Sequence, residues 1–259
     1  MGVALLQGSR RACGRRGQEG PVIRLPTVTT VILLRHGRTT ANAGGVLAGW
    51  TPGVQLDETG ETQVRAVGER LAKVPLAAVV SSPIERCRQT ADAVAAGRDL
   101  SVQSDDRLGE ARYGDWTGRT IKELVKDPLW TVVQQHPSAA VFPGPDGEGL
   151  AQTQARAVAA VREWNAKLGS DAVWLACSHG DVIKAILADA LGLHLDQFQR
   201  IVVDPASVSV VTYTETRPFV VRVNDTGGDV SGLVPPPRRR RRTKASSDAV
   251  VGGGAGTTV

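Results

Sequence analysis

Two histidines and two arginines of this chain of 259 residues lie just after short apolar stretches. Arg35 and His36 follow residues 27–34, Arg86 follows residues 77–82, and His179 follows residues 172–177. The stretches have the length and apolar composition of buried parallel strands. Because ligands bind at the carboxyl edge of an open α/β sheet, we expect the four side chains to meet in one crevice.

These four side chains suit chemistry on a phosphoryl group. A guanidinium group is planar, stays charged and matches the oxygens of a phosphate. A neutral imidazole can attack phosphorus and carry the phosphoryl group, and nearby arginines should lower the pKa of His36 so that it stays neutral. The second imidazole, on His179, can donate a hydrogen bond to the transferred group.

Such a reaction also needs an acid that protonates the leaving oxygen. The candidate is Glu110, in the segment LGEARYGDWTG. A carboxyl group beside a phosphate dianion should have a raised pKa, as a proton donor requires. The alternative is an ordinary surface acid, because Asp105 and Asp106 lie close by in the sequence.

Strand-like and helix-like segments alternate along the middle of the chain. Strands are predicted at 27–34, 77–82, 172–177, 207–213 and 219–223, the last two as closing strands related by a hairpin, and helices at 58–73, 83–96, 150–168 and 180–191. This alternation predicts an α/β fold, a three-layer sandwich with a mostly parallel central sheet and helices on both faces.

Residues 111–149 fit the alternation poorly. They contain one short predicted helix, at 119–126, and then a stretch rich in proline and glycine. An insertion of this kind often covers a site, so we expect a lid within a domain that spans residues 27–234.

The two ends of the chain differ from this domain in composition and charge. Residues 1–26 and the arginine-rich residues 235–259 are of low complexity, and we expect both to be disordered. Of the net charge of +5, residues 1–24 contribute +4, residues 235–259 contribute +5 and the remainder −4. The basic character therefore belongs to the tails and does not indicate a nucleic-acid-binding surface on the domain.

The cysteines and the start of the chain bear on the compartment. Cys13, Cys87 and Cys177 form neither a disulfide framework nor a metal-ligand spacing. The first residues have an apolar patch before their arginines, the reverse of a secretory signal. A reducing cytoplasm is the expected location.

Four segments resemble, in the same order, motifs of the histidine phosphatase superfamily, the phosphoglycerate mutase-like proteins of branch 1. They are LLRHGRTTAN, SSPIERCRQTA, LGEARYGDWTG and CSHGDVIKAIL, and the match covers roughly residues 27–215. The likeness is greatest to an actinobacterial subgroup often labelled probable phosphomutase. That label does not itself indicate mutase chemistry.

The resemblance implies the fold of that family and a role for each matching residue. His36 matches the nucleophile, Glu110 the proton donor and His179 the second histidine. The remaining motif positions, which the resemblance assigns to phosphate binding together with His179, are Arg35, Gly37, Thr39, Asn42, Arg86 and Gly180. No metal or other cofactor is expected, because arginines and imidazoles neutralise the phosphate charge.

Departures from the family pattern bear on the outcome of the reaction. The Trp116 pattern of phosphatases is present, and residues 119–149 lack the paired arginines of mutases. These features favour a phosphatase of small phosphomonoesters, with a phosphomutase of phosphoglycerate or sugar-phosphate type as the alternative. Arg38 stands where the family often has Glu, and Asp181 follows the closing S-H-G motif, where a small or apolar residue is common. Arg38 or Arg112 could hold a second anionic group of the substrate.

The expected partner is a small phosphorylated metabolite. No stable nucleic-acid or membrane partner is expected, although the arginines 238–242 could contact an anionic partner. A scaffold protein with a vestigial site is a third interpretation, and the complete set of motifs weighs against it. The sequence leaves the oligomeric state open, a homodimer included.

Other residues receive ordinary structural interpretations. His136 and His194 have no motif around them and should be exposed to solvent. Arg88 is expected to pair with an acidic neighbour. Trp50 and Trp116 either line the mouth of the site or pack within the domain.

Overall fold

One mixed sheet organises the protein. The computed structural model describes residues 28–228 together with Val251, Gly252 and Gly254. The strands are β1 (Thr29–Arg35), β2 (Ala78–Ser81), β3 (Val102–Ser104), β4 (Val173–Ser178), β5 (Val208–Tyr213) and β6 (Pro218–Asp225), in the order β3-β2-β4-β1-β5-β6. The first four run parallel to one another, whereas β5 is antiparallel to both β1 and β6. The predicted mostly parallel sheet and its closing hairpin are confirmed.

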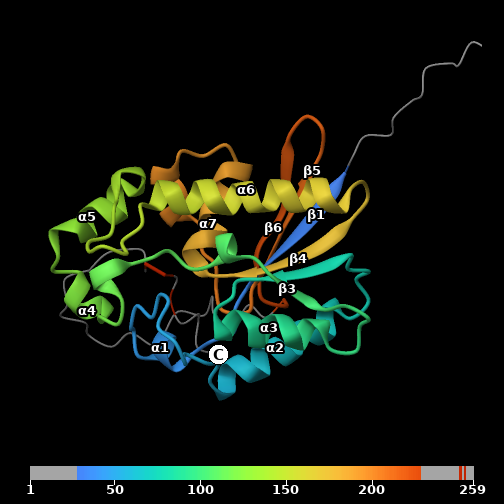
Figure 1. Ribbon diagram of the computed structural model, residues 1–259, viewed down its shortest axis with the longest axis horizontal. Helices are drawn as coiled ribbons and strands as arrows, with labels where there is room; N and C mark the ends of the chain where they lie inside the picture. The colour runs from blue at the N-terminus through green and yellow to red at the C-terminus, as the bar shows by residue number, and fades with distance from the viewer. Residues whose placement is uncertain (1–27, 229–250, 253, 255–259) are drawn as a thin grey trace, which may run out of the picture.

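Strand β1 shows why helices cover both faces of the sheet. Successive side chains of a strand point to opposite faces. Val31 and Leu33 pack in a cluster with α6 and α7, whereas Ile32 and Leu34 pack in a cluster with α2 and α3. Figure 1 shows these two helix pairs on opposite sides of the sheet, as the predicted three-layer α/β fold requires. Their bounds are α2 (Glu58–Leu71), α3 (Glu85–Ala95), α6 (Leu150–Leu168) and α7 (Gly180–Ala190).

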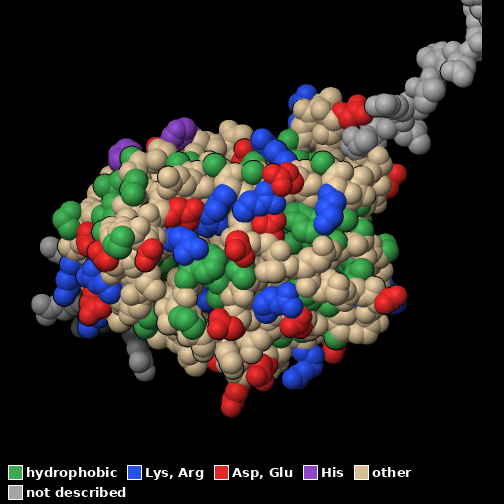
Figure 2. Space-filling view, in the orientation of Figure 1, with side chains coloured by type: hydrophobic (Ala, Val, Ile, Leu, Met, Phe, Trp, Pro, Cys, Tyr) green, Lys and Arg blue, Asp and Glu red, His purple; other side chains and the backbone are tan. Residues whose placement is uncertain are grey.

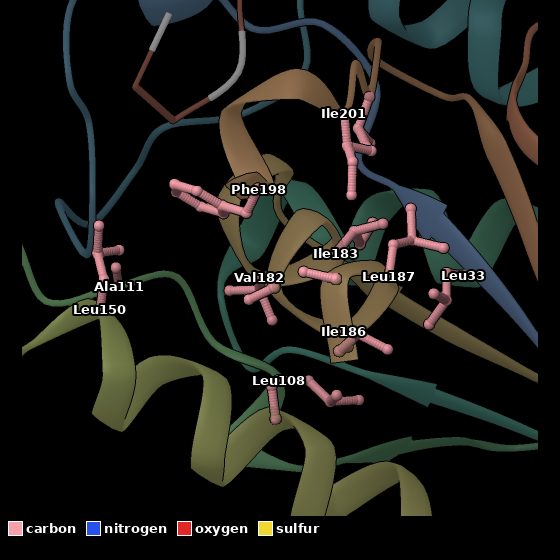
Figure 3. Packing of buried hydrophobic residues seen from close by; sticks show 14 of the residues in the cluster. Leu33, Leu108, Ala111, Leu150, Val182, Ile183, Ile186, Leu187, Phe198 and Ile201 are labelled. Carbon is pink, nitrogen blue, oxygen red and sulfur yellow. The ribbon is translucent and has the colours of Figure 1, made fainter. Parts of the chain in front are cut away.

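Helix α7 is enclosed by the rest of the domain. Ten of its eleven residues are buried. Its apolar side chains, among them Val182 and Ile186, lie between Leu33 of the sheet and Leu150 of α6 (Figure 3). This packing holds the start of α7 in place, and that start directly follows His179.

Residues 111–149, predicted as a lid, form a packed layer with two helices rather than one. Within this layer the ring centroid of buried Trp116 lies 6.2 Å from that of Trp130 and 5.5 Å from that of Phe142. These contacts give the layer an aromatic core. Its helices are α4 (Ile121–Leu124) and α5 (Pro128–Gln135), and the one-turn α1 spans Thr40–Ala43. Short 3-10 helices cover Asp106–Leu108, Gly114–Trp116, Pro137–Ala139 and Leu195–Arg200.

The predicted disordered segments lie outside the described residues, with three exceptions. Val251, Gly252 and Gly254 fall within residues 235–259 but are placed against the domain, and Val251 is buried. At these positions the structure differs from the prediction, because a valine supplies an apolar contact and glycine permits close approach. Among the described residues, no helix combines the length and apolarity needed to cross a membrane.

Candidate active site

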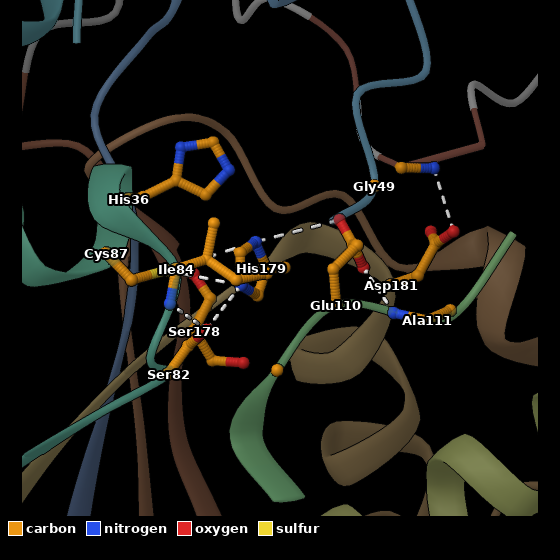
Figure 4. A network of polar contacts seen from close by, with 12 residues as sticks. His36, Gly49, Ser82, Ile84, Cys87, Glu110, Ala111, Ser178, His179 and Asp181 are labelled. Atoms are coloured by element: carbon orange, nitrogen blue, oxygen red, sulfur yellow. Dashed lines mark hydrogen bonds and ion pairs between the residues drawn. The ribbon is translucent and has the colours of Figure 1, made fainter. Parts of the chain in front are cut away.

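The carboxyl ends of three parallel strands deliver side chains to one place. His36 follows β1, His179 follows β4, and Arg86 lies in the first turn of α3 beyond β2. The His36 N–H donates to the Ser178 carbonyl over 3.0 Å, and the two imidazole centroids are 5.2 Å apart. Figure 4 shows His36, His179 and Glu110 gathered there from three separate segments.

These side chains surround a small cavity. His36, Arg86 and Glu110 line it together with Thr39 and Asn42, and its volume is about 40 Å³. His36, Arg86 and Glu110 are each no more than 3% exposed. Because ligand pockets usually measure about 300–1,000 Å³, the cavity in this state has room for water but not for a phosphomonoester.

The hydrogen bonds of His36 fix its tautomer. Its Nδ1 lies 2.7 Å from the Gly37 carbonyl oxygen, and the Arg86 Nε–H donates to its Nε2 over 3.3 Å. An arginine nitrogen can only donate, so Nε2 holds the lone pair and Nδ1 holds the hydrogen. Burial, and then the charges of Arg86 and Arg35, lower the pKa of His36 well below its ordinary value. His36 is therefore a neutral base with its lone pair on Nε2.

His179 is held in a similar way. The Ser82 hydroxyl lies 2.8 Å from its Nε2, and the Arg86 Nη2–H donates to its Nδ1 over 3.2 Å. Burial, followed by the charge of Arg86, lowers the pKa of His179 well below its ordinary value. The Glu110 Oε2 lies 3.7 Å from Nδ1, a contact that is not an ion pair because the imidazole is neutral.

Arg86 is the cation of this site. Its Nη2 also donates to the Gly49 carbonyl over 2.9 Å. Its Nη1 is buried and has no hydrogen-bond partner among the described residues. A buried guanidinium nitrogen without an acceptor costs free energy, so this position suits a bound anion.

Arg35, predicted as a phosphate ligand, has other partners in this state. Its guanidinium is fully buried and donates to the carbonyl oxygens of Val203, Gly252 and Gly254 over 2.8, 3.2 and 2.9 Å. Backbone oxygens thus occupy donors that the motif assigns to phosphate.

Glu110 has the electrostatic setting of a proton donor. Burial, and then the charge of Asp181, raise the pKa of Glu110 to about 7. Its backbone carbonyl accepts from Trp50 Nε1 over 2.7 Å and from Arg156 Nη2 over 3.0 Å, which fixes the segment. The interpretation of Glu110 as a surface acid is wrong, because the side chain is buried. Trp50 thus holds the backbone of Glu110.

The remaining motif residues shape the backbone around His36. The Gly37 N–H donates to Thr90 Oγ1 over 3.1 Å. Thr39 accepts from the Asn42 N–H as the cap of α1, and Asn42 Oδ1 accepts from Thr39. Gly180 begins α7. Thr39 and Asn42 line the cavity, whereas Gly37 and Gly180 are not part of its lining.

Arg38 and Arg112 do not reach the cavity. The Arg38 Nε forms an ion pair with Asp57 over 2.8 Å, at the start of α2. The Arg112 guanidinium lies 4.3 Å from the centroid of the Trp50 ring. In this state neither arginine is part of the cavity lining.

The ordinary interpretations of three other residues are confirmed. Arg88 pairs with Asp92 over 3.9 Å. The side chains of His136 and His194 are 68% and 69% exposed.

On the face drawn in Figure 2, Lys and Arg side chains are interspersed with Asp and Glu rather than gathered in one basic patch. Within residues 28–228 and the three placed tail residues, no cluster of His, Cys, Asp or Glu could hold a metal ion.

Several residues near the site carry no prediction from the sequence. Ser82 orients His179, and Thr90 anchors both Gly37 and the Arg86 carbonyl. The Tyr113 hydroxyl lines the cavity and donates to Asp181 over 3.1 Å. Ser82 and Thr90 stand inside the second motif, so their position was a usable signal.

A model of the histidine phosphatase superfamily (branch 1) matches residues 31–226. The chain belongs to this superfamily. Over 201 residues it is 29% identical to phosphoserine phosphatase 1 of Hydrogenobacter thermophilus, a match that covers 76% of this chain and 92% of that protein. Over 178 residues it is 32% identical to glucosyl-3-phosphoglycerate phosphatase of Mycolicibacterium vanbaalenii, which covers 66% of this chain and 78% of that protein.

A solved structure supports the same fold. Bacillus stearothermophilus YhfR matches with a TM-score of 0.70 at 29% sequence identity, and the match covers 76% of this chain and 97% of that one. The family and its phosphatase-named relatives support assignment of the chain to the phosphoric monoester hydrolases.

Proposed function

We propose that the protein hydrolyses small phosphomonoesters through a phosphohistidine on Nε2 of His36, without a metal. The observation that carries this proposal is the buried Arg86 guanidinium between two neutral imidazoles, with Nη1 lacking an acceptor in the described part of the chain. A phosphoryl group there would accept from Nη1 while lying beside the lone pair of His36. Cations in a dry site stabilise the charge of phosphoryl transfer.

The first step forms the phosphoenzyme. The Nε2 lone pair of His36 attacks phosphorus, the bond from phosphorus to the ester oxygen breaks, and the leaving oxygen takes the proton of Glu110. In the second step water attacks phosphorus and gives a proton to the Glu110 carboxylate. The bond to Nε2 breaks, inorganic phosphate leaves, and both residues return to their starting states.

His179 stabilises the transferred group in this scheme. In the structure its Nδ1 accepts from Arg86. When phosphate oxygens take over the donors of Arg86, the other tautomer, with the Ser82 hydroxyl donating to Nε2, presents an Nδ1–H to the phosphate. The short contact with Ser82 supports this role because a hydroxyl can donate or accept.

Small phosphorylated metabolites are the proposed substrate class. One relative is named phosphoserine phosphatase and another glucosyl-3-phosphoglycerate phosphatase.

Cys87 and Cys177 are free buried thiols, which supports a reducing, cytoplasmic location.

A panel of small phosphomonoesters followed by phosphorus NMR tests the proposal. We expect inorganic phosphate to appear, whereas a positional isomer of the substrate would indicate the mutase alternative. His36→Ala should abolish turnover. The matched control His136→Ala, at an exposed histidine, should retain turnover, and EDTA should have little effect. Activity that survives in His36→Ala, or that EDTA removes, contradicts the mechanism.

A further inference from the structure

Three residues close to the end of the chain form part of the cavity wall. Val251, Gly252 and Gly254, here called the C-terminal plug, line the same cavity as His36 and Glu110. The Val251 side chain is 2% exposed and belongs to the larger hydrophobic core. The plug is thus packed inside the candidate active site rather than resting on its surface.

The plug backbone binds two buried charged groups. The Gly252 N–H donates to Asp181 Oδ2 over 2.8 Å. The carbonyl oxygens of Gly252 and Gly254 accept from the two terminal nitrogens of Arg35 over 3.2 and 2.9 Å. Hydrogen bonds to charged groups are stronger than those between neutral groups, and Asp181 and Arg35 are both fully buried.

The residue types of the plug match the space that it fills. Gly252 has a φ of +75°, a region that side chains disfavour, and a Cβ there would lie 3.1 Å from Leu47 Cδ1 and 3.4 Å from the Tyr113 hydroxyl oxygen. Val251 supplies the apolar contact that anchors the segment. Other residue types at Gly252 would therefore weaken the docking.

We propose that the C-terminal plug is an intramolecular occupant of the substrate site and inhibits the enzyme while it is docked. This inference rests on the proposed function, because it requires that the substrate phosphate bind the Arg35 N–H groups. The plug carbonyls now accept from these same N–H groups. It also explains why the cavity measures only about 40 Å³. A substrate that replaces the plug presents an anionic oxygen to Arg35 and a hydroxyl or ammonium donor to Asp181.

Equilibrium binding of inorganic phosphate to the full-length protein, measured by calorimetry, tests the plug. Val251→Asn places a neutral polar group in the apolar anchor, and Gly252→Pro removes the N–H that reaches Asp181 and cannot adopt the observed φ. Val221→Asn, at an exposed valine of β6, is the matched control. If the plug closes nine molecules in ten, its release should tighten phosphate binding about tenfold.

We expect both plug variants to bind phosphate about tenfold more tightly than the wild type and the Val221→Asn control, and to gain kcat/KM on a small aryl phosphate by a similar factor. Equal or weaker binding by the folded plug variants overturns autoinhibition and leaves the phosphatase proposal standing. Failure of all four proteins to bind phosphate overturns both proposals.

Discussion

Glu110→Gln removes a buried ionisable group and nearly preserves its volume. Burial and the charge of Asp181 raise the pKa of Glu110 from its ordinary value of 4.5 to about 7. Between these two values the folded protein keeps the proton that the unfolded chain has lost. The free energy of unfolding of the wild type should therefore fall as pH rises through this window, and the glutamine variant lacks this loss.

The size of the effect follows from the two pKa values. Each pH unit within the window costs about 1.4 kcal/mol of stability. Between 4.5 and about 7 the loss amounts to about 3 kcal/mol. The unfolding free energy of Glu110→Gln minus that of the wild type should rise by this amount between roughly pH 4 and pH 8, because the other titrating groups are common to both proteins.

Urea unfolding of both proteins at several pH values measures this difference. Glu69→Gln, at an exposed carboxyl group of α2, is the matched control for the replacement of a carboxyl group by an amide. Parallel stability curves for the wild type and Glu110→Gln would refute the reasoning. They would show that Glu110 titrates in the folded protein as it does in the unfolded chain.

Three further predictions concern activity and stability. The alkaline limb of the kcat/KM profile should lie near the pKa of about 7 of Glu110, and Asp181→Asn should move it to lower pH, because the charge that raises this pKa is removed. Gly37→Ala should lower the free energy of unfolding by about 1–3 kcal/mol, measured with urea, because its Cβ would lie 2.8 Å from a valine methyl group of α2. Thr90→Val should cost about 1–3 kcal/mol in the same assay, because it leaves the buried Gly37 N–H without an acceptor; unchanged stability would contradict either assignment.

The parts of the fold that the sequence predicted are those with strong local signals. β1 and β4 are continuous apolar stretches, and the histidines that follow them had to reach the same sheet edge. β3, with the sequence VQS, was missed because an edge strand of three residues carries no apolar pattern. α5 was missed although Asp127 caps it and Pro128 occupies its first turn, both readable start signals.

The contacts between distant segments could not be predicted. The motif around Arg35 indicates a phosphate ligand, but its present partners come from residues more than 160 positions away. The glycine-rich end of the chain has the composition of a disordered tail, and only the folded pocket shows that Val251 and Gly252 fit it. Burial of Glu110 likewise depends on the surrounding layers, not on its neighbours in sequence.

The site of covalent phosphorylation tests the proposed chemistry most directly. The protein is mixed with a phosphomonoester that it hydrolyses, quenched under alkaline conditions that preserve phosphohistidine, digested, and mapped by mass spectrometry. We predict a phosphoryl group on His36 that forms and decays within a turnover and is absent from His36→Ala. A phosphoryl group on another residue, or turnover with no phosphoenzyme on His36, would contradict the mechanism.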